Sequence, residues 1–307
     1  MPRLFPKNII FVDAVKLTVV AIFGRNFQYH LGYALSGGGA KGFAHLGAFK
    51  VFESYGLKPD IIAGTSAGAL AGVFYADGFT PDEIGELFKK SELRKFIEFS
   101  IPKSGFFKST GVAKFLKDNL RSSTFEELKI PFKVVATDWK NAKTVIFSEG
   151  RSLVDAVVAS CSVPLVFNPI YIDGIPYVDG GLMKNFPVSV IREECKYVMG
   201  VNVSLITPLA EKNNLRNSAE RIFKLMSGSN TLIDRSLCDI LVEATEAQRY
   251  FMFDLNNIDE IREIGYECAV AALGEEKSLD IIRRCHRYYQ LEEKVKQRIN
   301  KLKRVAL

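Results

Sequence analysis

Two apolar runs, each followed by a turn of small residues and a helical pattern, constrain the fold of this chain most. Residues 33–36 (YALS) stop at three glycines, and residues 41–56 then repeat apolar side chains at helical spacing. Residues 60–64 (DIIAG) lead through small residues into a second helix that ends near Ala76. Successive strand–turn–helix units are typical of α/β proteins. We therefore expect an α/β fold, with a mostly parallel central sheet flanked by helices on both faces.

The later elements are less regular. Pro81 and the carboxylates after it indicate that a helix begins at Thr80. Residues 93–125 lose the periodicity, and we interpret them as an irregular excursion, with a lid or a pocket wall as its role. After residue 204 we expect mainly helix. Strands are expected at 133–139, 143–147, 171–173, 177–179, 197–204 and 250–254, and a helix at 152–159.

Charge and cysteine content exclude several classes of protein. A net charge of +6 over 307 residues is too small for a dedicated nucleic-acid binder, although it favours anionic lipid surfaces. The five cysteines are odd in number and form no C-x-x-C pair, which argues against a disulfide framework and a zinc site. We expect them to pack as free thiols in a reducing cytoplasm.

The pentapeptide GTSAG at 64–68 fits the G-x-S-x-G nucleophile elbow, in which a sharp strand-to-helix turn exposes the serine hydroxyl. Gly64 and Gly68 would leave room for the strained turn. The helix that follows adds positive potential at its N-terminus, which favours an oxyanion nearby. Alone the pentapeptide is a weak signal, but its position between strand and helix makes Ser66 a candidate nucleophile.

The glycine-rich run GGGAKG at 37–42 stands at the other strand-to-helix junction. It also satisfies G-x-G-x-x-G, but a dinucleotide fold requires an acidic residue at the end of the second strand, and GTSAG stands there instead. A P-loop would require Gly-Lys-Ser/Thr, which is not present. The alternative use of consecutive glycines is a row of backbone N–H groups directed at a developing oxyanion.

The catalytic base is the least obvious part of the site. The three histidines, His30, His45 and His286, all stand in contexts that indicate packing or surface roles. Asp179 precedes two glycines at the end of a predicted strand, where it is either a turn residue or a base in a dry pocket. Because Asp179 occurs together with the two glycine turns, we favour its role as the base.

The ordered set of these motifs resembles the patatin-like phospholipase family over roughly residues 32–205. The motifs are GGGAKG at 37–42, GTSAG at 64–68 and DGG at 179–181, with ASCSVP at 159–164 and NFP at 185–187 in further agreement. The resemblance implies a Ser66–Asp179 dyad that works without histidine, metal or cofactor. It also implies an oxyanion hole at Gly37, Gly38 and Gly39, in which Gly37 shapes the turn and the other two donate N–H groups. Lys41 is then expected to support the loop.

The resemblance implies hydrolysis of fatty-acyl esters of phospholipids or lysophospholipids. Three alternatives remain: a soluble esterase, thioesterase or peptidase with the same dyad, a non-catalytic lipid-binding protein, and a nucleotide-binding module. We expect three parts: an apolar extension at residues 1–31, a catalytic domain at 32–275 and a basic C-terminal helix at 276–307.

The two ends of the chain each allow two interpretations. Residues 8–25 are apolar, but Asp13 and Lys16 oppose both a signal peptide and a membrane span. We favour a helix packed on the core over an amphipathic element that touches a membrane. The basic C-terminal run similarly indicates a solvated face rather than a phospholipid-facing patch. We expect a cytoplasmic protein. The alternative is a protein that also makes peripheral contact with the inner membrane surface.

Overall fold

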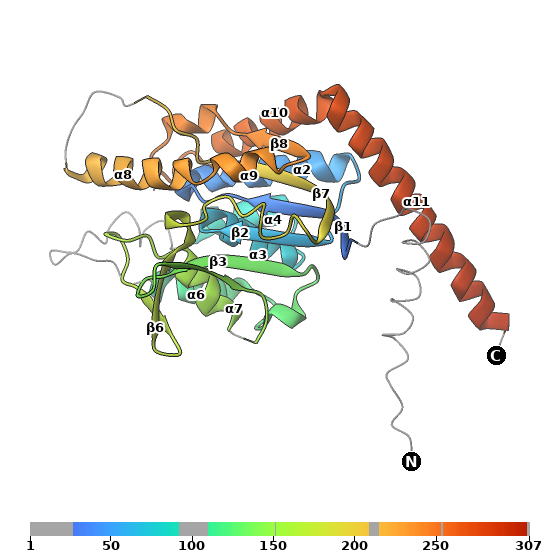
Figure 1. Ribbon diagram of the computed structural model, residues 1–307, viewed down its shortest axis with the longest axis horizontal. Helices are drawn as coiled ribbons and strands as arrows, with labels where there is room; N and C mark the ends of the chain where they lie inside the picture. The colour runs from blue at the N-terminus through green and yellow to red at the C-terminus, as the bar shows by residue number, and fades with distance from the viewer. Residues whose placement is uncertain (1–26, 92–109, 151, 209–214, 253, 306–307) are drawn as a thin grey trace, which may run out of the picture.

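One eight-stranded sheet runs through the middle of the protein (Figure 1). The computed structural model describes residues 27–91, 110–150, 152–208, 215–252 and 254–305. The strands are β1 (Tyr29–Leu35), β2 (Ile61–Thr65), β3 (Phe132–Asp138), β4 (Lys143–Phe147), β5 (Ile170–Ile172), β6 (Ile175–Asp179), β7 (Cys195–Asn202) and β8 (Ile240–Glu243). The α-helices are α2 (Phe43–Ser54), α3 (Ala67–Ala76), α4 (Pro81–Lys90), α6 (Thr110–Asn119), α7 (Leu153–Ser160), α8 (Leu215–Ser229), α9 (Leu232–Ser236), α10 (Ile258–Gly274) and α11 (Glu276–Val305). Short 3-10 turns are η1 (Gly39–Gly42), η2 (Phe125–Glu127), η3 (Gly180–Leu182) and η4 (Glu246–Arg249).

The sheet is parallel through its centre and antiparallel at one edge. The order is β5-β6-β3-β2-β1-β7-β8, and the run from β3 to β8 pairs in parallel. β6 and β4 both pair with β3 in the antiparallel sense, and β5 extends β6. The expected α/β fold with a mostly parallel sheet and flanking helices is therefore confirmed.

Strand register sets up the site. Leu35 of β1 pairs with Gly64 of β2. Gly37 and Ser66, each two residues further along, therefore leave the sheet at the same level. Thr65 pairs with Val135 of β3, and the next β3 residue pairs with Asp179 of β6. Because β6 runs antiparallel and overlaps only the last three residues of β3, it descends to the level at which β2 ends.

Alternate strand residues face two separate hydrophobic clusters, as the two-residue period of a strand requires. Leu31, Tyr33 and Leu35 belong to the larger cluster, which also contains side chains of α2, α3, α7 and α10. Ala34 packs in the smaller cluster with the segment at 186–191. The strands at the centre are thus covered on both faces, which fixes the chain ends that leave them.

The predicted start of a helix at Thr80 is confirmed. Its hydroxyl accepts a hydrogen bond from the Glu83 N–H at 3.2 Å, and the Glu83 carboxylate accepts one from the Thr80 N–H at 2.7 Å. This reciprocal capping box satisfies N–H groups that the first helical turn leaves without partners.

Four local expectations were wrong. The first strand begins at Tyr29 rather than Tyr33. No strand forms among the described residues of 250–254; the Met252 carbonyl instead accepts one hydrogen bond from Ala40. β8 lies where helix was expected, because four apolar-rich residues fit either period. The irregular stretch 93–125 contains α6, whose apolar residues pack on the core.

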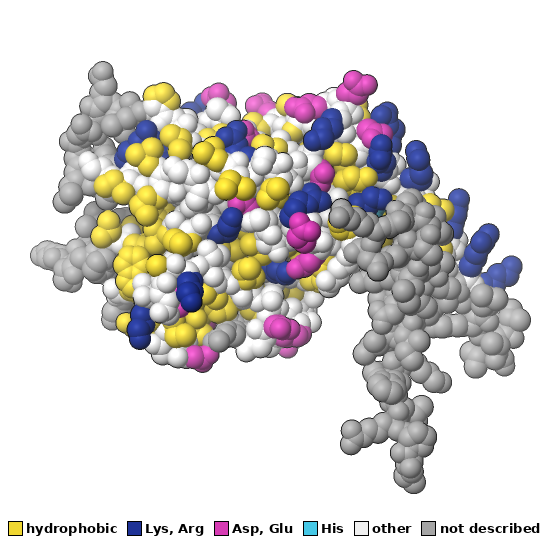
Figure 2. Space-filling model, in the orientation of Figure 1, with side chains coloured by type: hydrophobic (Ala, Val, Ile, Leu, Met, Phe, Trp, Pro, Cys, Tyr) yellow, Lys and Arg dark blue, Asp and Glu magenta, His cyan; other side chains and the backbone are white. Residues whose placement is uncertain are grey.

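The C-terminal segment is a single long helix, α11, that extends away from the body (Figure 1). Its first half docks through buried Ile282 and Cys285, and Tyr289 donates a hydrogen bond to the Lys58 carbonyl. Figure 2 shows Lys and Arg side chains along its outer side, where Lys294 and Arg298 are exposed. That this face meets solvent rather than phospholipid stays a prediction.

The apolar stretch 8–25 lies outside the described residues. Within the ranges that the structure describes, no helix is both long enough and apolar enough to span a membrane.

Candidate active site

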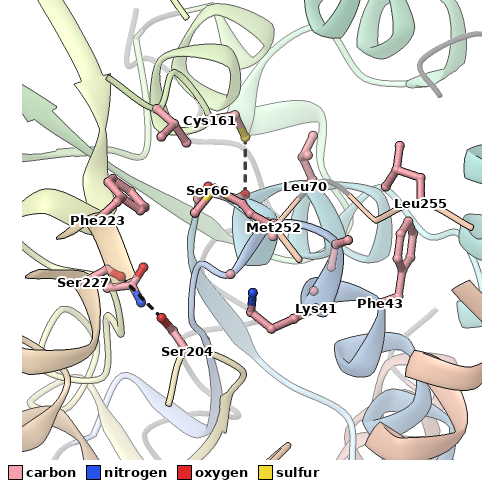
Figure 3. Close-up of a pocket in the computed structure, with 18 of the residues that line it drawn as sticks. Lys41, Phe43, Ser66, Leu70, Cys161, Ser204, Phe223, Ser227, Met252 and Leu255 are labelled. Atoms are coloured by element: carbon pink, nitrogen blue, oxygen red, sulfur yellow. Dashed lines mark hydrogen bonds between the residues drawn. The ribbon is translucent and has the colours of Figure 1, made fainter. Parts of the chain in front are cut away.

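Ser66 occupies a strained turn between β2 and α3. Its backbone has φ 52° and ψ −119°, a left-handed conformation that is rare for a side-chain-bearing residue. Its N–H donates to Ser160 Oγ at 2.8 Å, and Ser160 Oγ donates in turn to the Val135 carbonyl at 2.6 Å. Cys161 Sγ donates to the Ser66 carbonyl at 3.4 Å (Figure 3). The turn is thus held by α7 and β3 as well as by its own strand.

The two glycines of the elbow lie where no side chain fits. A Cβ built on Gly64 would lie 2.6 Å from the Gly68 carbonyl oxygen, and one built on Gly68 would lie 2.3 Å from the Leu35 carbonyl oxygen. Both distances are far below van der Waals contact. The backbone of β1, the elbow and α3 therefore approach each other closely, which agrees with the reason given for these glycines from the sequence.

Asp179 is fully buried at the end of β6. Its Oδ1 accepts a hydrogen bond from the Gly181 N–H at 2.7 Å, while Oδ2 has no partner among the described residues. Burial raises the pKa of Asp179 to about 7, against smaller lowering effects of the Ser66 hydroxyl and the Gly181 N–H. The Ser66 hydroxyl is therefore near this carboxyl, although no hydrogen bond of standard geometry joins the two side chains in the free protein.

The glycine-rich loop presents two consecutive N–H groups. The Gly37 N–H donates to the Asn185 carbonyl at 3.0 Å, and the Ala40 N–H donates to the Met252 carbonyl at 2.7 Å. Between them, the N–H groups of Gly38 and Gly39 have no acceptor among the described residues, and both residues line a pocket that contains Ser66. Gly37 is thus engaged in holding the loop, and the donors open to a ligand are the two that follow it.

Lys41 follows the loop, and its side chain lines the pocket although only 4% of its surface is exposed. Burial and the charge of Lys224 lower the pKa of Lys41 to about 8, and Glu220 acts in the opposite direction. No ion pair or hydrogen bond of its ammonium group is found within the described ranges. That Lys41 supports the loop stays a prediction, and its position places a cation in the lining of the pocket.

The three histidines lie outside the pocket lining. His45 is buried on α2, where its Nε2 pairs with the Ser36 carbonyl at 2.9 Å and burial lowers its pKa to about 4. His30 stacks on Tyr288 at 3.7 Å, and His286 Nε2 pairs with the Tyr55 carbonyl. All three have packing or backbone contacts of the kind expected from the sequence.

The pocket is apolar on one side, and on the other it combines polar side chains with Phe223. Figure 3 shows Phe43, Leu70 and Leu255 on one side of Ser66, and Ser204 with Ser227 on the opposite side. The apolar side continues through further side chains of α2, α4 and α6, which are Leu46, Ile84, Phe88 and Val112. Such a pocket suits a ligand with one long apolar part and one polar part.

Several site residues were not assigned a role from the sequence. Ser160 and Asn185 belong to the runs ASCSVP and NFP, so the sequence contained a signal for them. Nothing in the sequence indicated that Ser160 contacts the elbow or that Asn185 contacts Gly37. Met252 stood in the wrongly predicted strand, and the side chains of α8 carried no motif. Among the described residues, no group of three or more His, Cys, Asp or Glu side chains could hold a metal ion.

Comparison with known proteins assigns the chain to a family. The family model described as Patatin-like phospholipase matches residues 33–191. The protein YqhO of Bacillus subtilis is 31% identical over 218 residues, which cover 60% of this chain and 75% of YqhO. An NTE family protein of Mycobacterium tuberculosis is 30% identical over 218 residues, with 68% of this chain and 59% of that protein covered. The chain belongs to the patatin-like phospholipase family, and this membership makes it an enzyme of the lipid acyl hydrolase class.

Two further comparisons extend beyond the matched family region. Lysophospholipase NTE1 of Kluyveromyces lactis is 25% identical over 297 residues, which cover 86% of this chain but 20% of that protein. The crystal structure of VipD from Legionella pneumophila covers 80% of this chain and 66% of VipD, with a TM-score of 0.52 and 14% identity. The second comparison shows a shared fold. The chain spans 59% of the mycobacterial relative and 20% of the yeast relative.

Proposed function

We propose that this chain hydrolyses fatty-acyl esters of phospholipids or lysophospholipids, with Ser66 as nucleophile and Asp179 as general base. The observation that carries the proposal is the pairing of a serine on a strained turn with a fully buried carboxyl whose pKa is raised to about 7. A base with a pKa near the working pH combines ionisation with proton affinity, as general base catalysis requires.

The proposed reaction proceeds through an acyl-enzyme. Ser66 Oγ attacks the acyl carbonyl carbon while Asp179 takes the proton of the Ser66 hydroxyl. The carbonyl oxygen becomes an oxyanion that accepts hydrogen bonds from the N–H groups of Gly38 and Gly39. The intermediate collapses, and the alcohol leaves with the proton from Asp179. Water then attacks the acyl group, Asp179 again takes the proton, and the fatty acid leaves as the proton returns to Ser66.

The lipid assignment is supported by the pocket. Its apolar side chains lie beside Ser66, where an acyl chain would be held. The yeast relative is named a lysophospholipase, which favours the same substrate class.

All five cysteines are free thiols, which fits a reducing compartment, and we place the enzyme in the cytoplasm with access to the inner membrane surface.

The test is fatty-acid release from phospholipid and lysophospholipid vesicles by wild-type protein, Ser66→Ala and Asp179→Asn. We expect release by the wild type and its loss in both variants, with unchanged circular dichroism. Ser66-dependent cleavage of soluble thioesters or p-nitrophenyl esters, without release from any lipid, would keep the dyad and exclude the lipid substrate. Release that persists in Ser66→Ala would exclude the dyad.

A further inference from the structure

Lys41 is a buried cation whose nearby carboxylate, Glu220, acts on it without forming a direct ion pair. Its side chain is nearly enclosed, it lines the pocket, and it forms no ion pair among the described residues. Figure 3 shows its Nζ directed into the space between the two sides of the pocket. Burying an unpaired charge is costly, so such a group is favourable where a ligand supplies the opposite charge.

A second cation lies on the polar side of the same pocket. Lys224 of α8 is half-buried, its Nζ donates to Thr207 Oγ1 at 3.0 Å, and it lines the pocket. Both side chains line the same pocket, and the charge of Lys224 lowers the pKa of Lys41. Two neighbouring cations repel each other in the empty pocket, and an anion bound between them would relieve that repulsion.

The local charge balance leaves one positive charge for a ligand. Of the described residues that line the pocket, Glu220 is the one carboxylate, and its Oε1 already accepts the Met252 N–H at 3.0 Å. Two ammonium groups and one carboxylate therefore give the side chains that line the pocket a net charge of +1, and beyond the lining Arg221 adds a positive charge near Lys224 and Asp179 a negative charge near Ser66. The hydroxyls of Ser204 and Ser227, 3.4 Å apart, add donors on the same side.

We propose that Lys41 and Lys224 form a subsite for the phosphodiester of the substrate, an inference that rests on the proposed hydrolase function. A phosphodiester carries one negative charge and several acceptor oxygens, which matches the charge and the donors present. With the acyl chain on the apolar side and the ester at Ser66, the phosphate of a glycerophospholipid or lysophospholipid would lie on the α8 side. Lys224 and Glu220 lie outside the matched family region, whereas Lys41 lies within it, so the part of the subsite on α8 goes beyond the family assignment.

The test compares two substrates with the same acyl chain, lysophosphatidylcholine and the neutral monoacylglycerol. In Lys224→Gln, the ratio of kcat/KM for lysophosphatidylcholine, which carries the phosphodiester, to that for monoacylglycerol, which lacks it, should fall about 10- to 100-fold, the range expected for a charge-assisted hydrogen bond. Lys224→Arg should restore most of the ratio. Lys196→Gln, a change of the same kind on β7 away from the pocket lining, should leave the ratio unchanged.

Binding provides a readout that does not depend on turnover. Ser66→Ala protein should bind lysophosphatidylcholine by titration calorimetry, and the double variant with Lys224→Gln should bind it at least about 10-fold more weakly. Inorganic phosphate is the second probe. If phosphate binds in a Lys224-dependent way but the lysophospholipid ratio does not change, the subsite serves free phosphate and the proposal is wrong.

Other outcomes separate the two proposals. Equal losses on both substrates in Lys224→Gln would make Lys224 a structural residue and overturn the subsite alone. Absence of hydrolysis on every ester, with Lys224-dependent lysophospholipid binding intact, would overturn the proposed hydrolase function and leave the subsite supported.

Discussion

Two regions of the site are built in different ways: the strand ends that carry the proposed catalytic groups, called here the strand-end side, and the α8 side of the pocket. The strand-end side, with Gly38, Ser66 and Asp179, is fixed by sheet register and by hydrogen bonds of its own backbone. The α8 side is held by isolated side-chain contacts, such as Lys224 with Thr207 and Glu220 with Met252. Groups that react require accurate placement, whereas groups that attract a charged ligand tolerate more movement. Changes on the strand-end side should therefore alter the rate, and changes on the α8 side should alter substrate preference.

The largest effect is expected from Asp179→Asn. The amide keeps the acceptor for Gly181 but cannot take a proton from Ser66, so kcat/KM should fall about 10²- to 10⁴-fold. In the wild type, kcat/KM should rise with pH through about 7, because the base must be ionised and burial raises the pKa of Asp179 to that value. A wild-type acid limb near pH 4 would contradict the assignment of this carboxyl as the base.

The same variant should gain stability where the wild type holds a buried charge. The folded pKa of Asp179 is raised above its unfolded value, so the folded state binds more protons between pH 4 and 7 and stability falls as pH rises. Asp179→Asn has no carboxyl to ionise, so its stability does not fall in this way. The free energy of unfolding of the variant minus that of the wild type should increase by ~1–3 kcal/mol from pH 5 to pH 8. Urea unfolding at the two pH values measures it, and an unchanged difference would contradict the raised pKa.

Gly39→Ala should disturb the strand-end side through its backbone. Gly39 has φ 61°, and a Cβ built there would lie 2.2 Å from the Met252 carbonyl oxygen. We expect about a 10²-fold lower kcat, the loss typical of one oxyanion donor. Gly150→Ala is the matched control, because Gly150 has the same φ with nothing within 4 Å of its built Cβ. Equal activity losses in the two variants would mean that backbone strain alone, rather than the loop, is responsible.

Ser160→Ala tests the support of the elbow. It removes the acceptor of the Ser66 N–H and leaves the Val135 carbonyl without its hydroxyl donor, so stability should fall by about 1–3 kcal/mol and kcat roughly 10-fold. Ser162→Ala removes a buried hydroxyl that donates to the Val158 carbonyl instead. If both variants lose the same kcat, Ser160 has no special role in placing Ser66.

The smallest effect should come from Glu220→Gln on the α8 side. The amide oxygen can still accept the Met252 N–H, but the pocket gains one unit of positive charge. The preference for lysophosphatidylcholine over monoacylglycerol should therefore rise roughly 2- to 5-fold, opposite in sign to Lys224→Gln. Glu246→Gln, an exposed change on η4, should have no such effect. A fall in the ratio for Glu220→Gln would contradict the charge argument.

The motifs predicted more of the strand-end side than of the α8 side. G-x-S-x-G and the glycine run depend on local backbone geometry, so their residues carry the information themselves. α8 has no such motif, because Glu220 and Lys224 would look the same on any exposed helix face. The wrong strand at 250–254 has a related cause: Met252 is buried beside Val163 and Phe167 and accepts a hydrogen bond from the glycine loop, whereas Phe251 is exposed, so no sheet buries this segment.

By itself, the sequence determined the two strand–turn–helix units, the elbow at Ser66 and the free donors of the glycine loop, because each follows from contacts within a few residues. Only the tertiary structure decided that Asp179 reaches the level of Ser66. That requires β6 to run antiparallel and to overlap only the end of β3, a long-range pairing that no local pattern specifies. The same holds for Lys41 and Lys224, which lie far apart in the chain and line one pocket only because α8 folds over it.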